Sequence, residues 1–119
     1  MNLIHRGDVW LVNLNPAVGA EIRKTRPAVV ISNDIANLCA ATVTVLPVTD
    51  RGGKVYPFET EIPLRTGGLS KLSKIKCQQI RTVDKVRLVR FLGALPDHVV
   101  RAAERALCLH LALDPAVHG

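Results

Sequence analysis

Short runs of residues that either alternate between apolar and polar or are continuously apolar recur along this chain, as expected for β-strands with one or both faces buried. The runs lie at residues 7–14, 28–32, 42–48, 58–62, 73–80 and 90–95. Near the C-terminus the spacing becomes helical, with Val99 or Val100, Ala103, Leu107 and Leu111 on one side. Asp97 is placed to cap that helix, and Asp114–Pro115 is placed to end it. The pattern predicts several strands followed by one closing helix.

Some runs carry more detailed expectations. In residues 58–62 the alternation places both glutamates on the polar face. Residues 73–80 are predicted as one strand, with one side formed by Ile75, Cys77 and Gln79. Pro47 has no amide hydrogen, so it predicts an interruption of the 42–48 strand at a sheet edge or a bulge.

Two short helices are predicted between strands. Residues 33–39 favour a helical turn with Asn33 or Asp34 as its N-cap, because both side chains accept hydrogen bonds from backbone amides. Thr82 is placed to cap a second helix, which would end at Leu88.

Length and composition favour a single folding unit. With 119 residues, 48% of them hydrophobic, the chain is predicted to form one domain, residues 1–119. The predicted fold class is mainly β with a C-terminal α-helix, as a small antiparallel barrel, because closure removes the edges that short strands otherwise expose. No apolar run is long enough to cross a bilayer and the N-terminus lacks a signal-peptide core, so the expected location is the cytoplasm.

The connection from Asn15 to Thr25 is long and charged for a hairpin. Such loops usually contain about 2 to 5 residues, and longer ones more often serve a function. Its end and the start of the next strand carry Glu21, Arg23, Lys24 and Arg26. Pro27 restricts Arg26 to an extended conformation. Because burying unpaired charges is costly, these side chains are expected to face water or a charged partner.

The net charge of +6 arises downstream of residue 50. Between residues 65 and 90 only Asp84 opposes Arg65, Lys71, Lys74, Lys76, Arg81, Lys85, Arg87 and Arg90. This cluster would create a positive field that attracts nucleic acid or an acidic peptide. A solvated, solubilising surface is the alternative, and charge alone favours neither.

Cysteines and histidines give no sign of a metal site. Cys39, Cys77 and Cys108 are far apart and include no C-x-x-C pair, which argues against both a disulfide framework and a zinc site. Most such thiols are inert and buried. The four histidines are equally scattered. We therefore expect no metal and no cofactor.

Three stretches, taken together, resemble a known family. They are RGDVWLVNLNPAVGAEIRKTRPAVVISND, VLPVTD and QQIRTVDKVRL, followed by the amphipathic C-terminal helix. In this order they resemble the MazF/PemK (Kid) toxins of bacterial type II toxin–antitoxin pairs, over nearly the whole chain. The resemblance implies an SH3-like barrel of the CcdB/PemK type, a homodimer, and sequence-specific, metal-independent cleavage of single-stranded RNA. It also implies a cognate antitoxin whose acidic tail occupies the same basic site.

Two positions distinguish branches of that family. In the PemK-like branch a histidine precedes the loop glutamate and an acidic residue precedes the Q-x-R-T block. Here Ala20 and Gln78 occupy those places. The chain therefore resembles the MazF-like branch, and neither position supplies a histidine or carboxylate base.

The resemblance also implies site residues. Arg26 in K-T-R-P matches the family's catalytic arginine, Thr49 closing V-L-P-V-T matches its catalytic threonine, and Glu21 matches a glutamate of the first loop. The residues expected to bind RNA are Arg23, Lys24, Ser32, Asn33, Gln79 and Arg81. For Gln79 a structural hydrogen bond is an equally good expectation.

Cleavage without a metal uses the neighbouring 2′-hydroxyl as nucleophile and leaves a 2′,3′-cyclic phosphate and a 5′-hydroxyl. Arg26 suits stabilisation of the dianionic phosphorane, because its planar guanidinium binds two phosphate oxygens and stays protonated. Thr49 can donate a hydrogen bond to another phosphoryl oxygen. Glu21 is the candidate base for the 2′-proton, with in-line geometry alone as the alternative.

Other interpretations stay open from sequence. Arg26, Thr49 and Glu21 each also suit a purely structural role, as a surface ion pair, a turn residue and a neighbour of Arg23. A non-catalytic RNA-binding barrel would satisfy the charge pattern. A gyrase poison of the same fold is less favoured, because that branch acts through an aromatic residue near its C-terminus and this chain ends in DPAVHG.

Overall fold

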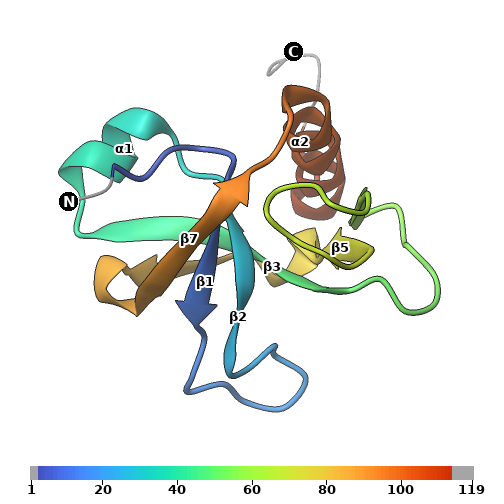
Figure 1. The fold of residues 1–119 in the computed structure, drawn as a ribbon, viewed down its shortest axis with the longest axis horizontal. Helices are drawn as coiled ribbons and strands as arrows, with labels where there is room; N and C mark the ends of the chain where they lie inside the picture. Colours follow the sequence, from blue (N-terminus) through green and yellow to red (C-terminus); the bar gives the residue numbers. More distant parts are fainter. Residues whose placement is uncertain (1–2, 114–119) are drawn as a thin grey trace.

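The computed structural model describes residues 3–113, which form one antiparallel seven-stranded sheet and a C-terminal helix (Figure 1). The strands are β1 (Asp8–Asn13), β2 (Thr25–Val30), β3 (Thr42–Asp50), β4 (Thr60–Ile62), β5 (Ser73–Ile75), β6 (Arg81–Asp84) and β7 (Leu88–Ala94). The helices are α1 (Asp34–Cys39) and α2 (Asp97–Leu111), with the short 3₁₀ helices η1 (Cys77–Gln79) and η2 (Lys85–Arg87).

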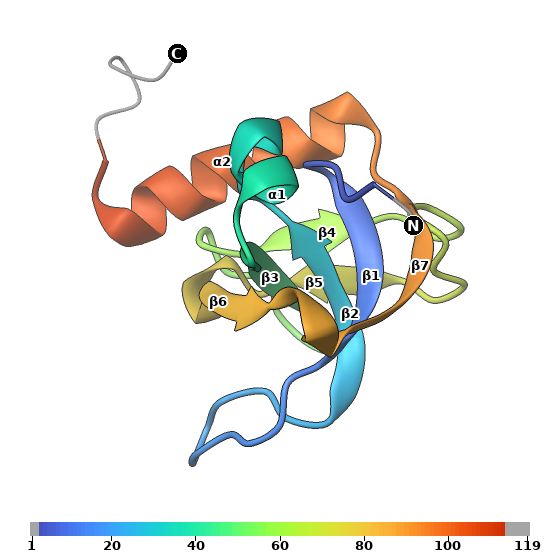
Figure 2. The ribbon, with the colours of Figure 1, turned by 90° about the vertical axis from the view of Figure 1, so that its left-hand side faces the viewer.

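The strand order is β4-β5-β3-β2-β1-β7, and β6 pairs with the first part of β3. The two ends of this order meet through the connection between β4 and β5, which packs against β7. A Cβ added to Gly68 would lie 2.0 Å from the Leu92 carbonyl oxygen, so only glycine permits this contact. This contact joins the two edges of the curled sheet, which forms a small barrel (Figure 2).

Alternate strand residues enter two hydrophobic clusters on opposite faces of the sheet. The helix-side core contains Val9, Val29, Leu46, Val48 and Ile75, and α2 adds Val99, Ala103 and Ala106 to it. The loop-side core contains Trp10, Val12, Ala28, Val30 and Val45, and Ile22 of the β1–β2 loop packs on it. The strands therefore bury both faces.

Asn33 caps α1 as one of the two expected alternatives. Its side-chain oxygen accepts a hydrogen bond from the Ala36 amide at 2.8 Å. Replacing Asn33 with alanine should lower the free energy of unfolding by about 1 kcal/mol, because this amide loses its partner. Urea denaturation measures the loss, and Asn33→Asp, which keeps the acceptor, should stay near the wild type. An equal loss in both variants would contradict the capping role.

Pro47 lies inside β3 and does not interrupt it, contrary to expectation. It pairs with Ala28 of β2, and on its other side its carbonyl accepts a hydrogen bond from the Lys76 amide at 2.8 Å. On that side β3 changes its partner: it pairs with β6 as far as Val45 and with β5 from Val48 onward. An amide hydrogen at position 47 would meet no strand there, so the proline costs no ladder bond.

Residues 73–80 do not form the single strand that the alternation predicted. β5 ends at Ile75 and η1 follows it before β6 begins at Arg81. The break lets β5 and β6 pair with different parts of β3. A short helix does form between Thr82 and Leu88, as η2, but its expected cap is wrong: Thr82 lies in β6, and Asp84 caps η2 by accepting a hydrogen bond from the Val86 amide at 2.9 Å.

Glu59 is buried, whereas the alternation placed it on the polar face with Glu61. The strand β4 contains only Thr60–Ile62, in which Glu61 is exposed as expected. Glu59 precedes the strand in a turn, in which its backbone amide donates a hydrogen bond to the Tyr56 carbonyl at 2.9 Å. Outside the strand, the period of two no longer decides which way the side chain points.

The helix α2 begins at Asp97, but Asp97 is not its cap. Pro96 holds the N-cap position and no side chain caps the helix. As the first helical residue, Asp97 places its negative charge at the positive end of the helix dipole. The expected stop at Asp114–Pro115 lies outside the described residues. No helix within residues 3–113 is long and apolar enough to cross a membrane.

The cysteines occupy different environments. Cys77 lies fully buried in the helix-side core, and burial raises the pKa of its thiol to about 11. It therefore stays protonated and unreactive near neutral pH. Cys108 is half-buried, and Cys39 is exposed at the end of α1.

Candidate active site

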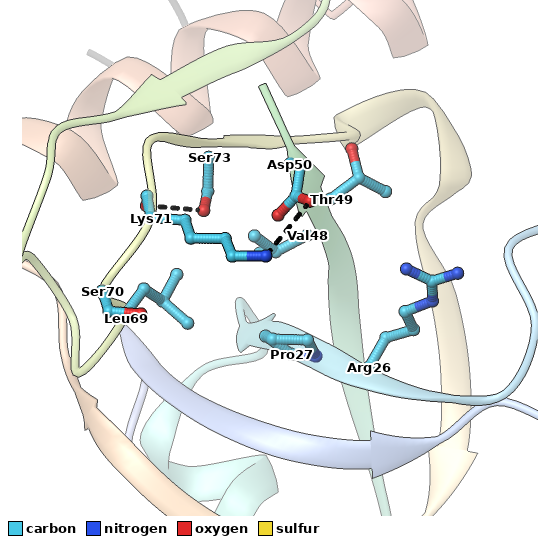
Figure 3. A pocket seen from close by; sticks show the side chains of 9 residues that line it. All are labelled: Arg26, Pro27, Val48, Thr49, Asp50, Leu69, Ser70, Lys71 and Ser73. Carbon is cyan, nitrogen blue, oxygen red and sulfur yellow. Dashed lines mark hydrogen bonds and ion pairs between the residues drawn. The ribbon is translucent and has the colours of Figure 1, made fainter. Parts of the chain in front are cut away.

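Arg26 and Thr49 come together through the register of two paired strands. Ala28 pairs with Pro47, and the same register continued by two residues places Arg26 opposite Thr49. Both positions share the face of the loop-side core, at the end of β2 and β3 where apolar residues give way to polar ones. Figure 3 shows both side chains on the same side of β3, lining one hollow of about 160 Å³.

The guanidinium of Arg26 is exposed and has few internal partners. Its Nε donates one long hydrogen bond, 3.4 Å, to the Arg23 carbonyl. No carboxylate of the described chain lies within ion-pair distance of it. Thr49 is half-buried beside it. A cationic planar donor and a hydroxyl thus face the same open space, as binding of a phosphate requires.

Glu21 lies in a second hollow. It is exposed in the β1–β2 loop, and the second hollow, of about 410 Å³, lies between this loop and the η1–β6 segment. Gln79 fixes the loop there, accepting a hydrogen bond from the Ile22 amide at 2.8 Å and donating one to the Ala20 carbonyl at 3.4 Å. The structural hydrogen bond expected as one alternative for Gln79 is therefore present. The structure does not bring Glu21 into the hollow shared by Arg26 and Thr49.

Three of the basic residues expected to bind RNA lie at or near the loop. Arg81 lines the second hollow and donates to the Leu14 carbonyl at 3.0 Å. Arg23 donates to the Gly19 carbonyl at 2.8 Å, and Lys24, at a positive φ of 69°, keeps its side chain exposed. These cations surround the loop base without pairing to carboxylates of the described chain.

Ser32 and Asn33 lie elsewhere. They follow the other end of β2, about 20 Å along the strand from Arg26. The Ser32 hydroxyl donates to Asn37 and accepts from the Thr44 amide at 3.0 Å, while Asn33 caps α1. Their polar atoms are thus bonded within the protein, away from the hollow of Arg26 and Thr49.

Residues that the sequence analysis did not assign to the site also line that hollow. The most notable are Asp50 and Lys71, which form an ion pair of 3.9 Å, together with Ser70 and Leu69 (Figure 3). The only feature of the sequence that hinted at a binding role for Lys71 was its place in the basic segment 65–90. Its place in the fold depends on the strand break after Ile75, which the sequence pattern did not reveal.

A buried ionic cluster adjoins Thr49. Lys74 is the cross-strand partner of Thr49, and its Nζ lies 3.1 Å from Glu59 Oε1 and 2.9 Å from the Lys54 carbonyl oxygen. Lys76 Nζ lies 3.8 Å from the same carboxylate. The Glu59 side chain is 1% exposed and that of Lys74 9%, so this pair is shielded from water.

Further hydrogen bonds stabilise the ionised form of Glu59. Its carboxylate accepts from Gln78 Nε2 at 2.9 Å and from the Tyr56 amide at 3.2 Å. Burial alone would raise the pKa of the Glu59 carboxyl, but these bonds, with those from Lys74, outweigh it and hold the pKa below its usual value. The cluster fixes the β3–β4 loop to β5 next to Thr49.

The described residues offer no evident metal-binding group. Within residues 3–113, no three His, Cys, Asp or Glu side chains are grouped as metal ligands would be. The groups that line the hollow are the guanidinium of Arg26, the hydroxyl of Thr49 and the ammonium of Lys71, and donors of these kinds are suited to binding an anion.

A known protein family matches nearly the whole of the described chain. The sequence profile described as "PemK-like, MazF-like toxin of type II toxin-antitoxin system" matches residues 5–111. The chain belongs to this family. The resemblance found from the sequence is thereby confirmed.

Individual proteins of this family are similar to the chain in sequence and structure. "Endoribonuclease MazF9" of Mycobacterium tuberculosis is 40% identical over 116 residues, which cover 93% of this chain and 98% of the relative. The crystal structure of MazF (form I) from Deinococcus radiodurans is 27% identical with a TM-score of 0.81, covering 94% of this chain and 99% of that one. A mycobacterial endoribonuclease solved with its cognate antitoxin shares the fold at 21% identity and a TM-score of 0.78, covering 93% and 97%. The predicted mainly-β fold with a C-terminal helix is therefore confirmed.

Proposed function

We propose that this MazF-family toxin is a sequence-specific endoribonuclease that cleaves single-stranded RNA in the cytoplasm. The observation that carries the proposal is the shared hollow of Arg26 and Thr49, in which a guanidinium without an internal carboxylate partner in the described chain faces solvent beside a hydroxyl. The 40% identity to a relative named an endoribonuclease supports the same activity.

The proposed reaction needs no metal. The 2′-hydroxyl of the nucleotide before the cut attacks the phosphorus, the bond to the 5′-oxygen breaks, and that oxygen takes up a proton from water. Arg26 binds two non-bridging oxygens as the negative charge grows, and Thr49 donates a hydrogen bond to one of them. The products are a 2′,3′-cyclic phosphate and a 5′-hydroxyl.

Glu21 is the proposed acceptor of the 2′-proton. Its position in the second hollow requires either that RNA spans both hollows or that the β1–β2 loop brings the carboxylate closer. If neither occurs, in-line placement of the 2′-hydroxyl by the other contacts supplies the alternative.

RNA binding is proposed along the loop and the second hollow. Arg23 and Lys24 would contact phosphates, and Arg81 and Gln79 would position bases near the cut. Gln79 would do so partly by holding the loop. A contact from Ser32 or Asn33 would need a longer RNA path, because both lie beyond the far end of β2.

The proposed protein partners are a second copy of the chain and a cognate antitoxin. An acidic antitoxin segment would be attracted by the same cations that attract RNA phosphates, and would inhibit by occupying the hollow. The mycobacterial neighbour solved with its antitoxin supports this kind of partner.

The test is incubation of the purified protein with single-stranded RNA in excess EDTA. We expect cleavage that leaves 5′-hydroxyl and 2′,3′-cyclic phosphate ends, and no cleavage when the scissile 2′-hydroxyl is replaced by hydrogen. Thr49→Val, which keeps the shape but removes the donor, should lower the rate about tenfold, the effect of one lost hydrogen bond. RNA that is bound but stays intact would favour a non-catalytic RNA-binding barrel instead.

A further inference from the structure

Lys71 places a second cation in the hollow of Arg26 and Thr49. It lies in the connection between β4 and β5, and Figure 3 shows its side chain extending across the hollow toward Asp50. Arg26 enters the same hollow from β2. Figure 3 shows Arg26 and Thr49 on one side of β3 and Lys71 with Asp50 on the other side, so positive charge flanks this hollow from two separate segments of the chain.

The backbone that carries Lys71 is fixed. Its carbonyl accepts a hydrogen bond from the Ser73 hydroxyl at 2.9 Å, and the next carbonyl, of Leu72, accepts one from the Arg51 amide at 3.0 Å. Upstream, the same connection is held by the close approach of Gly68 to β7. The backbone at Lys71 is thus held in place, so ligand binding has to order the side chain but not the connection that carries it.

The ammonium group itself is weakly engaged. Its only ion-pair partner in the described chain is Asp50, at 3.9 Å, and both side chains are about three-quarters exposed, 75% and 74%. Exposed pairs of this kind contribute little. Lys74, which belongs to the same basic segment, is by contrast buried against Glu59. Lys71 is therefore free to exchange its carboxylate partner for a phosphate.

We propose that Lys71 binds the RNA phosphate next to the scissile one and so fixes the register of the strand over Arg26 and Thr49. This inference rests on the proposed ribonuclease function. Lys71 acts on binding and positioning, and the chemical step remains with Arg26 and Thr49.

The test measures binding of an RNA that carries 2′-deoxyribose at the cut site, at several salt concentrations. Lys71→Ala should weaken RNA binding about fivefold. It should also make the negative slope of the logarithm of the association constant against log salt shallower by about 0.7, the value for one phosphate contact on a single strand. Lys71→Arg, which keeps the charge, should restore both. Lys85→Ala is the matched control, because Lys85 lies at the opposite end of β3, about 27 Å along the strand.

Replacing one RNA phosphate by an uncharged linkage shows which phosphate Lys71 contacts. Methylphosphonate in place of the phosphate adjacent to the cut should weaken wild-type binding about as much as Lys71→Ala, and should add nothing to the loss in that variant. Asp50→Asn, which removes the competing carboxylate, should bind the unmodified RNA about two- to fivefold more tightly. On cleavable RNA, Lys71→Ala should raise KM by about the factor by which it weakens binding, and should lower kcat far less than Arg26→Ala does, because the strand loses a positioning contact but the groups at the scissile phosphate stay in place.

The outcomes are separable. The role of Lys71 would be overturned if Lys71→Ala left the salt dependence of RNA binding unchanged, or if Lys71→Ala and Lys85→Ala weakened RNA binding equally. It would also be overturned if Lys71→Ala bound RNA normally and only weakened inhibition by an acidic peptide. A wild-type protein that neither binds nor cuts RNA would overturn the proposed function itself.

Discussion

Replacing Arg26 with alanine should lower kcat for RNA cleavage by about two to three orders of magnitude. The guanidinium lies exposed beside Thr49 with no carboxylate partner in the described chain, so its charge is available to a phosphorane. Removing one preorganised donor from an anion-stabilising site typically costs about 3 to 4 kcal/mol of transition-state stabilisation. Single-turnover rates at saturating RNA measure this loss directly, because they separate chemistry from binding.

Two further variants distinguish a catalytic role from a general effect of charge. Arg26→Lys keeps the charge but not the planar pair of donors, so it should recover only part of the rate. Arg101→Ala removes an exposed arginine from α2 and should leave kcat near the wild-type value. All three proteins should unfold at similar urea concentrations, because neither arginine forms an ion pair within the described chain. A rate for Arg26→Ala within a few-fold of the wild type would remove the basis of the proposed mechanism.

The sequence located Arg26 better than Thr49. A charged residue directly before Pro27 and a buried strand is restricted to an extended, exposed position by local rules alone, and the structure has it there. Thr49 carried no comparable local signal, because a threonine at a strand end is common. Its assignment depended on the family resemblance, and its position opposite Arg26 depends on the β2–β3 register, which local patterns do not fix.

The rest of the site could not be predicted because it depends on breaks in the strand pattern. Alternation suggested one strand over residues 73–80, but η1 interrupts that segment and separates β5 from β6. Pro47 of β3 lies opposite this break, between the residues that pair with β6 and those that pair with β5. Alternation also assigned Glu59 to the solvent face, although it precedes β4 and its carboxylate meets Lys74. Each error arises where pairing between distant segments overrides the local period.

The buried pair of Glu59 and Lys74 leads to the largest expected effect on stability. Glu59→Gln keeps the shape of the side chain but leaves the Lys74 ammonium buried without its counter-charge. Breaking a buried pair in this way typically costs about 3 to 5 kcal/mol. Glu61→Gln is the matched control, because Glu61 pairs with Arg51 at 3.6 Å with both side chains more than 40% exposed, and should cost less than about 1 kcal/mol.

A double variant tests whether the uncompensated charge is the cause. Glu59→Gln combined with Lys74→Met removes both charges and should regain much of the loss, because an apolar side chain of similar length suits the buried site. Urea denaturation of the single and double variants gives the coupling between the two residues. A double variant no more stable than Glu59→Gln alone would mean that packing or the hydrogen bonds from Gln78 and Tyr56 carry the effect instead.

The dependence on pH follows from the lowered pKa of Glu59. Because the carboxyl has a lower pKa in the folded than in the unfolded protein, its ionisation stabilises the fold at pH values above the usual pKa of 4.5. That contribution is lost as the pH falls through the folded-state value. The difference in unfolding free energy between the wild type and Glu59→Gln should therefore be full at pH 7 and narrow steadily below about pH 4.5. A difference that stays constant into the acid range would show that ionised Glu59 is not what holds the β3–β4 loop beside Thr49.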